Sequence, residues 1–264
     1  MPDSISIYLA SPGEILLTDS QNRKLGKDSI NNIEYNEIPD GVYYQESIGN
    51  PEGIVVPEPS KNIWIPHPIS GQYSINVIGT GNGEYTLGTL IYDKSGELKD
   101  MDFKGNTAIN DIQEFELNYS ADNIQDAENY RMVNIDIKPG SDPNPINIKS
   151  KGVTPVAILS DQFFNAKDVV ISSVLLVDAK PKKSNIEDVN NDGFQDLVIH
   201  FDTQSLNLST TSTEAVLIGS LNDCSLIKGT DAVRVLSVPE KRSAILKLFD
   251  FFATEFYAMF NILG

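Results

Sequence analysis

The sequence predicts an all-β protein: two tandem β-sandwich domains followed by a C-terminal amphipathic helix. Short stretches in which apolar and polar residues alternate recur up to residue 238, and turn-forming residues separate them at intervals of roughly ten residues. The 3.6-residue period of a helix is sustained only after residue 238. The charge is also uneven, because residues 1–128 hold 7 Lys and Arg against 21 Asp and Glu, whereas residues 129–264 hold 13 against 16. The two halves therefore differ in surface character.

Residues 1–119 are predicted to form an acidic β-sandwich domain. Residues 4–10 alternate strictly between polar and apolar side chains, which is typical of a half-buried strand. Residues 40–62 are rich in Gly, Pro, Asn and Ser, so a long surface loop is expected there. The strands expected in this half cover residues 4–10, 14–18, 33–39, 63–65, 72–79, 84–93 and 111–119.

The polar, acidic residues 120–130 are predicted to be a linker, and residues 131–238 a second β-sandwich domain. β-Branched and apolar runs indicate the strands of this second half. They are expected at residues 132–137, 146–148, 155–159, 168–177, 197–201, 214–219 and 232–236.

Oxygen-bearing side chains recur at every second position from 188 to 192, Gly193 then permits a sharp turn, and Asp196 follows three residues later. Calcium takes about 6–8 oxygen ligands, and a loop with this spacing can supply most of them. The twelfth residue of an EF-hand loop is a Glu, but the twelfth residue counted from Asp188 is Ile199, so the stretch is not an EF-hand. A strand is expected to follow it. The predicted Ca²⁺ ligands are Asp188, Asn190, Asp192, Phe194 (through its backbone carbonyl) and Asp196.

The alternative for this stretch is a solvated turn between two strands, because Asp, Asn and Gly dominate turns for reasons unrelated to metal.

Two further pairs of acidic residues are candidate metal ligands. Asp136 and Asp142 could extend the calcium site from another loop, and Asp100 and Asp102 could form a second cation site, with a charged turn as the default.

Composition and motifs narrow the function classes. A formal net charge of −17 argues against a nucleic-acid partner, which needs a basic surface. The single cysteine, Cys224, cannot form a disulfide within the chain and is expected to be small, partly buried and near a turn. His67 and His200 lie far apart in sequence, and no nucleophile elbow, phosphate loop or zinc-protease helix motif occurs, so the chain is predicted not to be an enzyme.

The segment 239–264 is predicted to be an amphipathic helix with a wide apolar face. Asp250 and Glu255 argue against a membrane-spanning helix. The helix is expected to pack on a sheet or on another copy of the chain, with an interfacial membrane anchor as the alternative.

The second half resembles a module that recurs in multidomain secreted and cell-surface proteins of bacteria and archaea. The stretches that carry this resemblance are 135–144 (IDIKPGSDPN), 152–159 (GVTPVAIL), 188–201 and 213–215. The resemblance implies a non-catalytic accessory module with a calcium loop, in which Asn191 and Cys224 stand where Gly is expected. The first half is similar, more loosely, to β-sandwich modules at the ends of such extracellular proteins, through residues 17–26 and 73–87.

These observations predict a calcium-binding, extracellular or cell-surface pair of modules. No signal peptide opens the sequence, so the chain is expected to be a fragment or to follow a missing segment. The favoured use is adhesion or binding of a glycan or another cell-surface ligand through loops that bear Tyr43, Tyr44 and Trp64. The alternatives are a passive spacer and the accessory domains of a secreted hydrolase.

Overall fold

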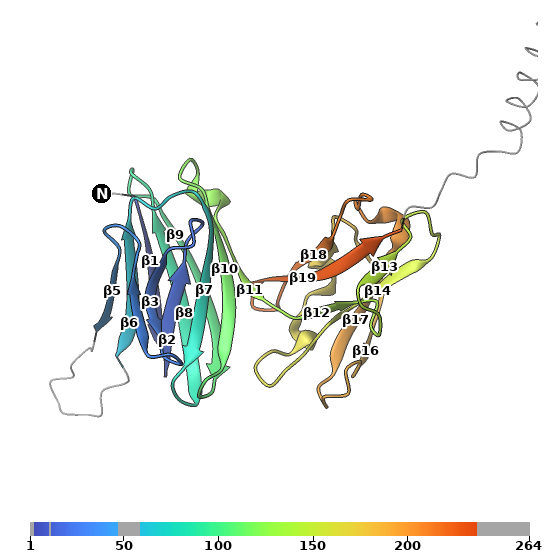
Figure 1. Cartoon of the computed structure of the whole chain (residues 1–264), viewed down its shortest axis with the longest axis horizontal. Coiled ribbons are helices and arrows are strands. Elements are labelled where there is room, and N and C mark those ends of the chain that lie inside the picture. Colours follow the sequence, from blue (N-terminus) through green and yellow to red (C-terminus); the bar gives the residue numbers. More distant parts are fainter. Residues whose placement is uncertain (1–2, 11, 47–58, 237–264) are drawn as a thin grey trace, which may run out of the picture.

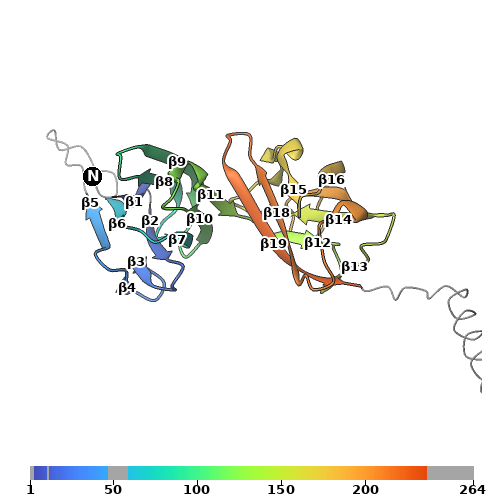
Figure 2. The ribbon, with the colours of Figure 1, turned by 90° about the horizontal axis from the view of Figure 1, so that it is seen from above.

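The computed structural model describes residues 3–10, 12–46 and 59–236 and is nearly all β. Its sheets enclose two separate clusters of buried apolar residues, which belong to the two units visible side by side in Figures 1 and 2. The helices in the described ranges are single 3₁₀ turns at Ile124–Asp126 (η1), Ala166–Asp168 (η2), Ile171–Ser173 (η3) and Thr203–Ser205 (η4). The all-β prediction is therefore confirmed for this part of the chain.

Two facing five-strand layers form the first unit. One sheet has the order β5-β6-β1-β8-β9, and it faces the run β10-β7-β2-β3-β4 of a longer sheet. These strands are β1 (Ser4–Ala10), β2 (Gly13–Thr18), β3 (Lys24–Asp28), β4 (Ile33–Asn36), β5 (Val42–Glu46), β6 (Ser60–Pro66), β7 (Gly71–Gly79), β8 (Gly83–Tyr92), β9 (Leu98–Thr107) and β10 (Ile112–Tyr119).

The alternation in the sequence explains this packing, because successive strand residues point to opposite faces of a sheet. Ile5, Ile7 and Leu9 of β1 are at most 1% exposed and meet side chains such as Ile75 and Phe115 of the opposing layer. The intervening residues of β1 consequently form part of an outward-facing surface, which is where the first candidate site lies.

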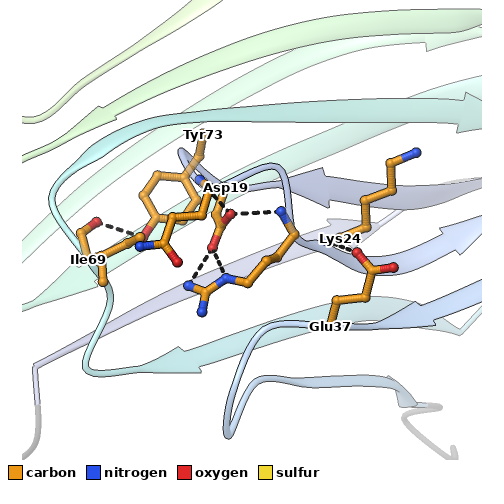
Figure 3. Close-up of polar contacts among 7 residues, drawn as sticks. Asp19, Lys24, Glu37, Ile69 and Tyr73 are labelled. Carbon is orange, nitrogen blue, oxygen red and sulfur yellow. Dashed lines mark hydrogen bonds and ion pairs between the residues drawn. The ribbon is translucent and has the colours of Figure 1, made fainter.

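The hairpin between β2 and β3 is held by a buried carboxylate (Figure 3). Asp19 is 3% exposed and accepts hydrogen bonds from the backbone N–H groups of Gln21 and Arg23 and from the Arg23 guanidinium, at 2.6–2.9 Å. Nearby, the Tyr73 hydroxyl donates to the Ile69 carbonyl at 2.7 Å. A buried charge is tolerated because all these donors compensate it. Asp19 therefore has a structural role in the first unit.

The second unit packs the sheet β12-β14-β17-β16 against strands β13, β15, β18 and β19 of the longer sheet. Its core contains Ile137, Val156, Ile199 and Phe201, all of them 0% exposed. The strands are β12 (Ile135–Ile137), β13 (Asn144–Ile146), β14 (Val153–Ile158), β15 (Leu175–Leu176), β16 (Pro181–Glu187), β17 (Asp196–Asp202), β18 (Glu214–Ser220) and β19 (Leu226–Val235).

One strand, β11 (Glu128–Met132), belongs to both units. It pairs antiparallel with β10 and parallel with β19, so the longer sheet runs without interruption from the first unit into the second (Figure 1). The end of the segment predicted as a linker is therefore a strand. Side chains reinforce the connection: Lys228 forms a 2.6 Å ion pair with Glu116, and Arg131 Nη2 donates at 2.9 Å both to Gln113 Oε1 and to the Phe163 carbonyl.

Three local expectations need correction. Residues 168–177 are not one strand but the end of the turn η2, the turn η3 and the short β15, because backbone bonds from Val169 N–H to the Ala166 carbonyl and from Val174 N–H to the Ile171 carbonyl close two turns. The predicted loop 40–62 contains β5 and the start of β6, because pairing of β6 with β1 and of β5 with β6 overrides a polar composition. The strands β9 and β16 were not expected, because both are charged edge strands with few apolar residues.

The amphipathic helix predicted at 239–264 lies outside the described residues. Among the described residues, no helix has the length and apolar character needed to cross a membrane.

Candidate functional site

The outward face of the sheet β5-β6-β1-β8-β9 presents a cluster of aromatic side chains. Strand register places Trp64 beside Val42 and Ser6, and it places Tyr8 in one row with Tyr44. Because paired residues share a face of the sheet, these side chains all lie opposite the core. We call this surface the aromatic face; it carries Tyr8, Tyr44, Trp64 and Tyr92 together with Val42, Asn62, Leu90, Asp100 and Asp102.

The aromatic face is open to solvent at its edges and partly covered in its centre. Tyr44 is 46% exposed and Val42 44%, whereas Tyr8 and Trp64 are half-buried. Trp64 and Tyr44 sit on adjacent strands and are offset by two residues, which separates their Cα atoms by about 8 Å. Neighbouring aromatic side chains on one face of a sheet offer apolar ring surfaces to a ligand.

Tyr8 is fixed in position by its neighbours. Its ring lies over Gly88, where an added Cβ would come within 2.1 Å of the ring carbons, and its hydroxyl donates to Asp102 Oδ1 at 3.1 Å. Burial, and next the negative charge of Asp102, raises the pKa of the Tyr8 hydroxyl above its ordinary value. The hydroxyl therefore stays protonated at neutral pH and can donate a hydrogen bond.

Tyr43, Tyr44 and Trp64 were predicted to lie on loops and to contact a ligand there, and the structure places them differently. All of them lie on strands, Tyr43 and Tyr44 on β5 and Trp64 on β6. Tyr43 points into the first unit, where it packs against the core and its hydroxyl donates to Glu14, so it is not available to a ligand. Tyr44 and Trp64 share the aromatic face.

The predicted calcium loop forms the hairpin between β16 and β17. Its first three oxygen-bearing side chains are drawn inward by backbone N–H groups. Asp188 accepts from Asp192 N–H at 3.2 Å and Gly193 N–H at 3.0 Å, while Asn190 Oδ1 accepts from Asp192 N–H at 3.1 Å. Asp192 Oδ1 accepts from Phe194 N–H at 2.8 Å. The structure thus brings Asp188, Asn190 and Asp192 together around the turn.

Asp196 is different because it is 0% exposed. Its Oδ2 accepts from Val189 N–H at 2.9 Å and its Oδ1 from Ser160 N–H at 2.8 Å, so it ties the start of the loop to a neighbouring segment. Within the described ranges, no group of three or more His, Cys, Asp or Glu side chains is arranged to hold a metal ion. Carboxylate and amide oxygens are the donors that calcium prefers, and the 2.8 Å bond from Asn190 Nδ2 to Asp192 Oδ2 holds two of these side chains next to each other.

The other two acidic pairs do not join this loop. Asp136 lies beside Asp142 and Asp231 on the far side of β14, where the three carboxylates line a cleft of about 390 Å³. Burial first, and then the charges of Asp231 and Asp142, raise the pKa of the Asp136 carboxyl. Asp100 and Asp102 belong to the aromatic face and to no cation site shown among the described residues.

Of the two histidines, His67 Nδ1 lies 2.7 Å from Asp3 Oδ1, and His200 lies on β17 in the other unit. Cys224 is exposed, contrary to the expectation of partial burial. Asn191 and Cys224, which stand where the resembled module has Gly, have left-handed backbones with φ of 60° and 72°. Glycine adopts such conformations most easily, which accounts for the Gly expected at both positions but not for the Asn and Cys that this chain has there.

Comparisons with known proteins add little to this geometry. No protein-family model matches the sequence, and no curated protein matches it. One solved structure that matches is SGBP-B of the mixed-linkage glucan utilization locus of Bacteroides ovatus, in complex with a mixed-linkage heptasaccharide. The identity is 12% and the TM-score 0.25, over 75% of this chain and 37% of that one, so the chain spans little more than a third of that structure. A match at this TM-score carries no argument about function.

Sequence reasoning missed Tyr8, Asn62 and Tyr92 as members of a site, and it considered Asp102 only as a cation ligand. A signal was present, because Tyr8 stands at an outward position of a strictly alternating strand. The alternation of Ile63 and Ile65 likewise directs Trp64 outward. The sequence does not reveal which strands become neighbours, so the gathering of these residues could not be foreseen.

Proposed function

We propose that this chain is a non-enzymatic binding protein that acts outside the cell and holds a neutral glycan on the aromatic face. The observation that carries the proposal is the placement of Tyr8, Tyr44 and Trp64 on one exposed sheet face with polar side chains between them. One such neighbour is Asn62, which pairs with both Tyr8 and Tyr44.

The chemistry of this face matches that of a sugar chain. The electron-rich faces of aromatic rings attract the C–H groups on the flat side of a pyranose ring. Carboxylates and amides such as Asp102 and Asn62 accept hydrogen bonds from sugar hydroxyls. A rigid sheet face also loses little conformational freedom when a ligand binds, which favours affinity.

Electrostatics favours a neutral glycan over an anionic one. Residues 1–128 carry a net charge of 7 − 21 = −14, and Asp100 and Asp102 stand on the face itself. An anionic polysaccharide would be repelled by this field, which lowers both its association rate and its affinity.

The test is a glycan array followed by isothermal titration calorimetry with the oligosaccharides that bind. Trp64→Ala and Tyr44→Ala should each weaken binding about tenfold, equivalent to about 1.4 kcal/mol. Tyr35→Ala is the matched control, because Tyr35 lies on β4 in the opposite layer and faces away from the core. Silence across the array, or equal losses in all three variants, would contradict the proposal.

A second part of the proposal is a calcium ion in the loop between β16 and β17, held by Asp188, Asn190, Asp192 and the Phe194 carbonyl. Asp196 positions the loop, and its oxygens keep lone pairs that can face the ion. Clustered carboxylates repel one another until a cation neutralises them, so binding should order the loop and stabilise the second unit.

Calorimetry of the metal-stripped protein with CaCl₂ tests this part. Saturation at about 100 times Kd should add about 2.7 kcal/mol of stability. Asp188→Asn should reduce the heat and the rise in melting temperature, whereas Asp202→Asn, whose exposed carboxylate pairs with Lys182, should change neither. Absence of both heat and thermal shift in the native protein would exclude a calcium site.

A passive spacer is the second candidate function, favoured by the continuous sheet through β11. It predicts a silent array together with a stiff, elongated particle in small-angle X-ray scattering. Glycan binding that depends on Trp64, with or without calcium, would argue against a purely passive role.

A further inference from the structure

The edge of the aromatic face runs into a cleft at the junction of the two units. The cleft has a volume of about 680 Å³ and lies between strand β9, the segment 125–129 and the turn 223–226 that connects β18 to β19. Asp100 and Asp102 belong to both places, since they line the cleft and also stand in the outward rows that contain Trp64 and Tyr8.

We propose that the aromatic face and this cleft form one composite site, so that a long neutral sugar chain crosses the first unit and ends against the second. This inference rests on the proposed function and extends it by assigning a role to the second unit. The ligand class is a neutral glycan long enough to reach from Trp64 past Asp102 to the turn at Asp223.

The register sets the path of such a chain. One row crosses the sheet through Trp64, Ser6 and Leu90 to Asp100, and the neighbouring row ends at Asp102. Because β9 is the edge strand of this sheet, nothing in the sheet lies beyond these two carboxylates. A ligand that follows either row therefore leaves the sheet at Asp100 or Asp102, the two residues of these rows that also line the cleft.

The cleft offers hydrogen-bond acceptors, which a polyhydroxylated chain needs. Its lining includes Asp126, Glu128 and Asp223. Asn129 lines it too, is 3% exposed, and its Oδ1 has no hydrogen-bond partner among the described residues, while its Nδ2 donates to Thr89 at 3.0 Å. A buried acceptor without a donor is rare in folded proteins. A sugar hydroxyl in the cleft supplies the missing donor once the Asn129 side chain turns toward it, because Oδ1 is shielded from solvent in the unliganded chain.

A sugar fits these acceptors better than a metal ion does. The carboxylates of the cleft come from three separate segments, and no group of three or more acidic, His or Cys side chains in the described part of the chain is arranged to hold a metal ion. Hydroxyl donors can reach spread-out acceptors one at a time, whereas a cation needs them around a single centre.

The joint between the units keeps both halves of the site in register. Leu226, which ends the lining turn, pairs with Tyr130 of β11, and the turn is closed by a 2.9 Å bond from Ser225 N–H to Asp223 Oδ1. The Lys228–Glu116 ion pair is largely shielded from solvent, with side chains 20% and 6% exposed. Such fixed placement reduces the entropic cost of engaging two units with one ligand.

Cys224 provides a selective probe of the cleft, since it is exposed, lines the cleft and is the only cysteine of the sequence. The experiment is calorimetry of the full chain with neutral β-gluco-oligosaccharides from the trisaccharide to the octasaccharide, in the presence of a chelator, before and after alkylation with a bulky maleimide. We expect the octasaccharide to bind about tenfold tighter than the trisaccharide. Alkylation should remove this advantage and leave trisaccharide binding unchanged.

The matched control is Cys224→Gly, which suits the left-handed backbone at this position. It should keep the preference for the octasaccharide and be insensitive to the reagent. The octasaccharide, but not the trisaccharide, should also protect Cys224 of the native chain from alkylation. Binding that needs Trp64 but shows neither chain-length preference nor protection would overturn the composite site alone. Absence of binding by every oligosaccharide here, together with silence across the glycan array, would overturn the proposed function and this inference together.

Discussion

Replacing Asp196 with Asn tests whether this buried carboxylate organises the loop without help from a metal ion. Asp196 is 0% exposed, and each of its oxygens accepts one backbone N–H, from Val189 and from Ser160. An amide has one oxygen, so in Asp196→Asn one of the two N–H groups would face an NH₂ donor. Loss of a charge-assisted bond with a partner left unsatisfied costs about 2–3 kcal/mol. The second unit should lose that much stability.

Urea unfolding in chelator, followed through the transition of the second unit, measures the effect as a lowered midpoint with unchanged slope. Asp202→Asn at the other end of β17 is the control. Its carboxylate is 48% exposed and forms a surface ion pair with Lys182, so its loss should cost less than about 1 kcal/mol. The reasoning fails if Asp196→Asn destabilises no more than Asp202→Asn, because the two N–H bonds would then add nothing.

Two further substitutions probe other parts of the structure. Asp136→Asn should raise the melting temperature at neutral pH. Burial first, and then the charges of Asp231 and Asp142, raise the pKa of the Asp136 carboxyl in the folded state, so the native protein loses stability as the pH rises above the unfolded-state pKa of about 3.8. In thermal scans below that pH, the variant should therefore lose its advantage over the native protein. Gly88→Ala should weaken glycan binding several-fold in calorimetry, because the new methyl group displaces the Tyr8 ring. The circular dichroism spectrum should stay almost unchanged. Unchanged affinity would show that Tyr8 does not contact the glycan.

Local patterns were sufficient to predict the strands whose two faces differ most. In β1 and β7, alternation of buried and outward residues is nearly complete, and both strands lie where it indicated. The charged strand β9 gave no such signal, since only Phe103 and Thr107 are buried in it. It forms a hairpin with β8, in which ten positions pair, so the contact is local and only the missing apolar pattern concealed the strand.

The candidate sites divide in the same way. The spacing of oxygen-bearing residues after Asp188 is a local pattern, so the sequence alone could indicate a loop there. In the structure, the Asp188 carboxylate accepts hydrogen bonds from backbone N–H groups of the same loop. The aromatic face depends on the order of five strands, in which β1 lies between β6 and β8. Sequence reasoning identified Tyr44 and Trp64 as ligand-bearing residues but could not pair them with Tyr8, because strand order is a property of the whole fold.

The shared strand β11 limits how evolution can separate the two halves. Cutting the chain before Glu128 would leave β10 with a row of unpaired N–H and C=O groups along one side, and cutting after Met132 would do the same to β19. Either cut therefore gives one of the two halves a new open sheet edge, which can pair with other chains. We expect a half produced in this way to aggregate more readily than the intact pair.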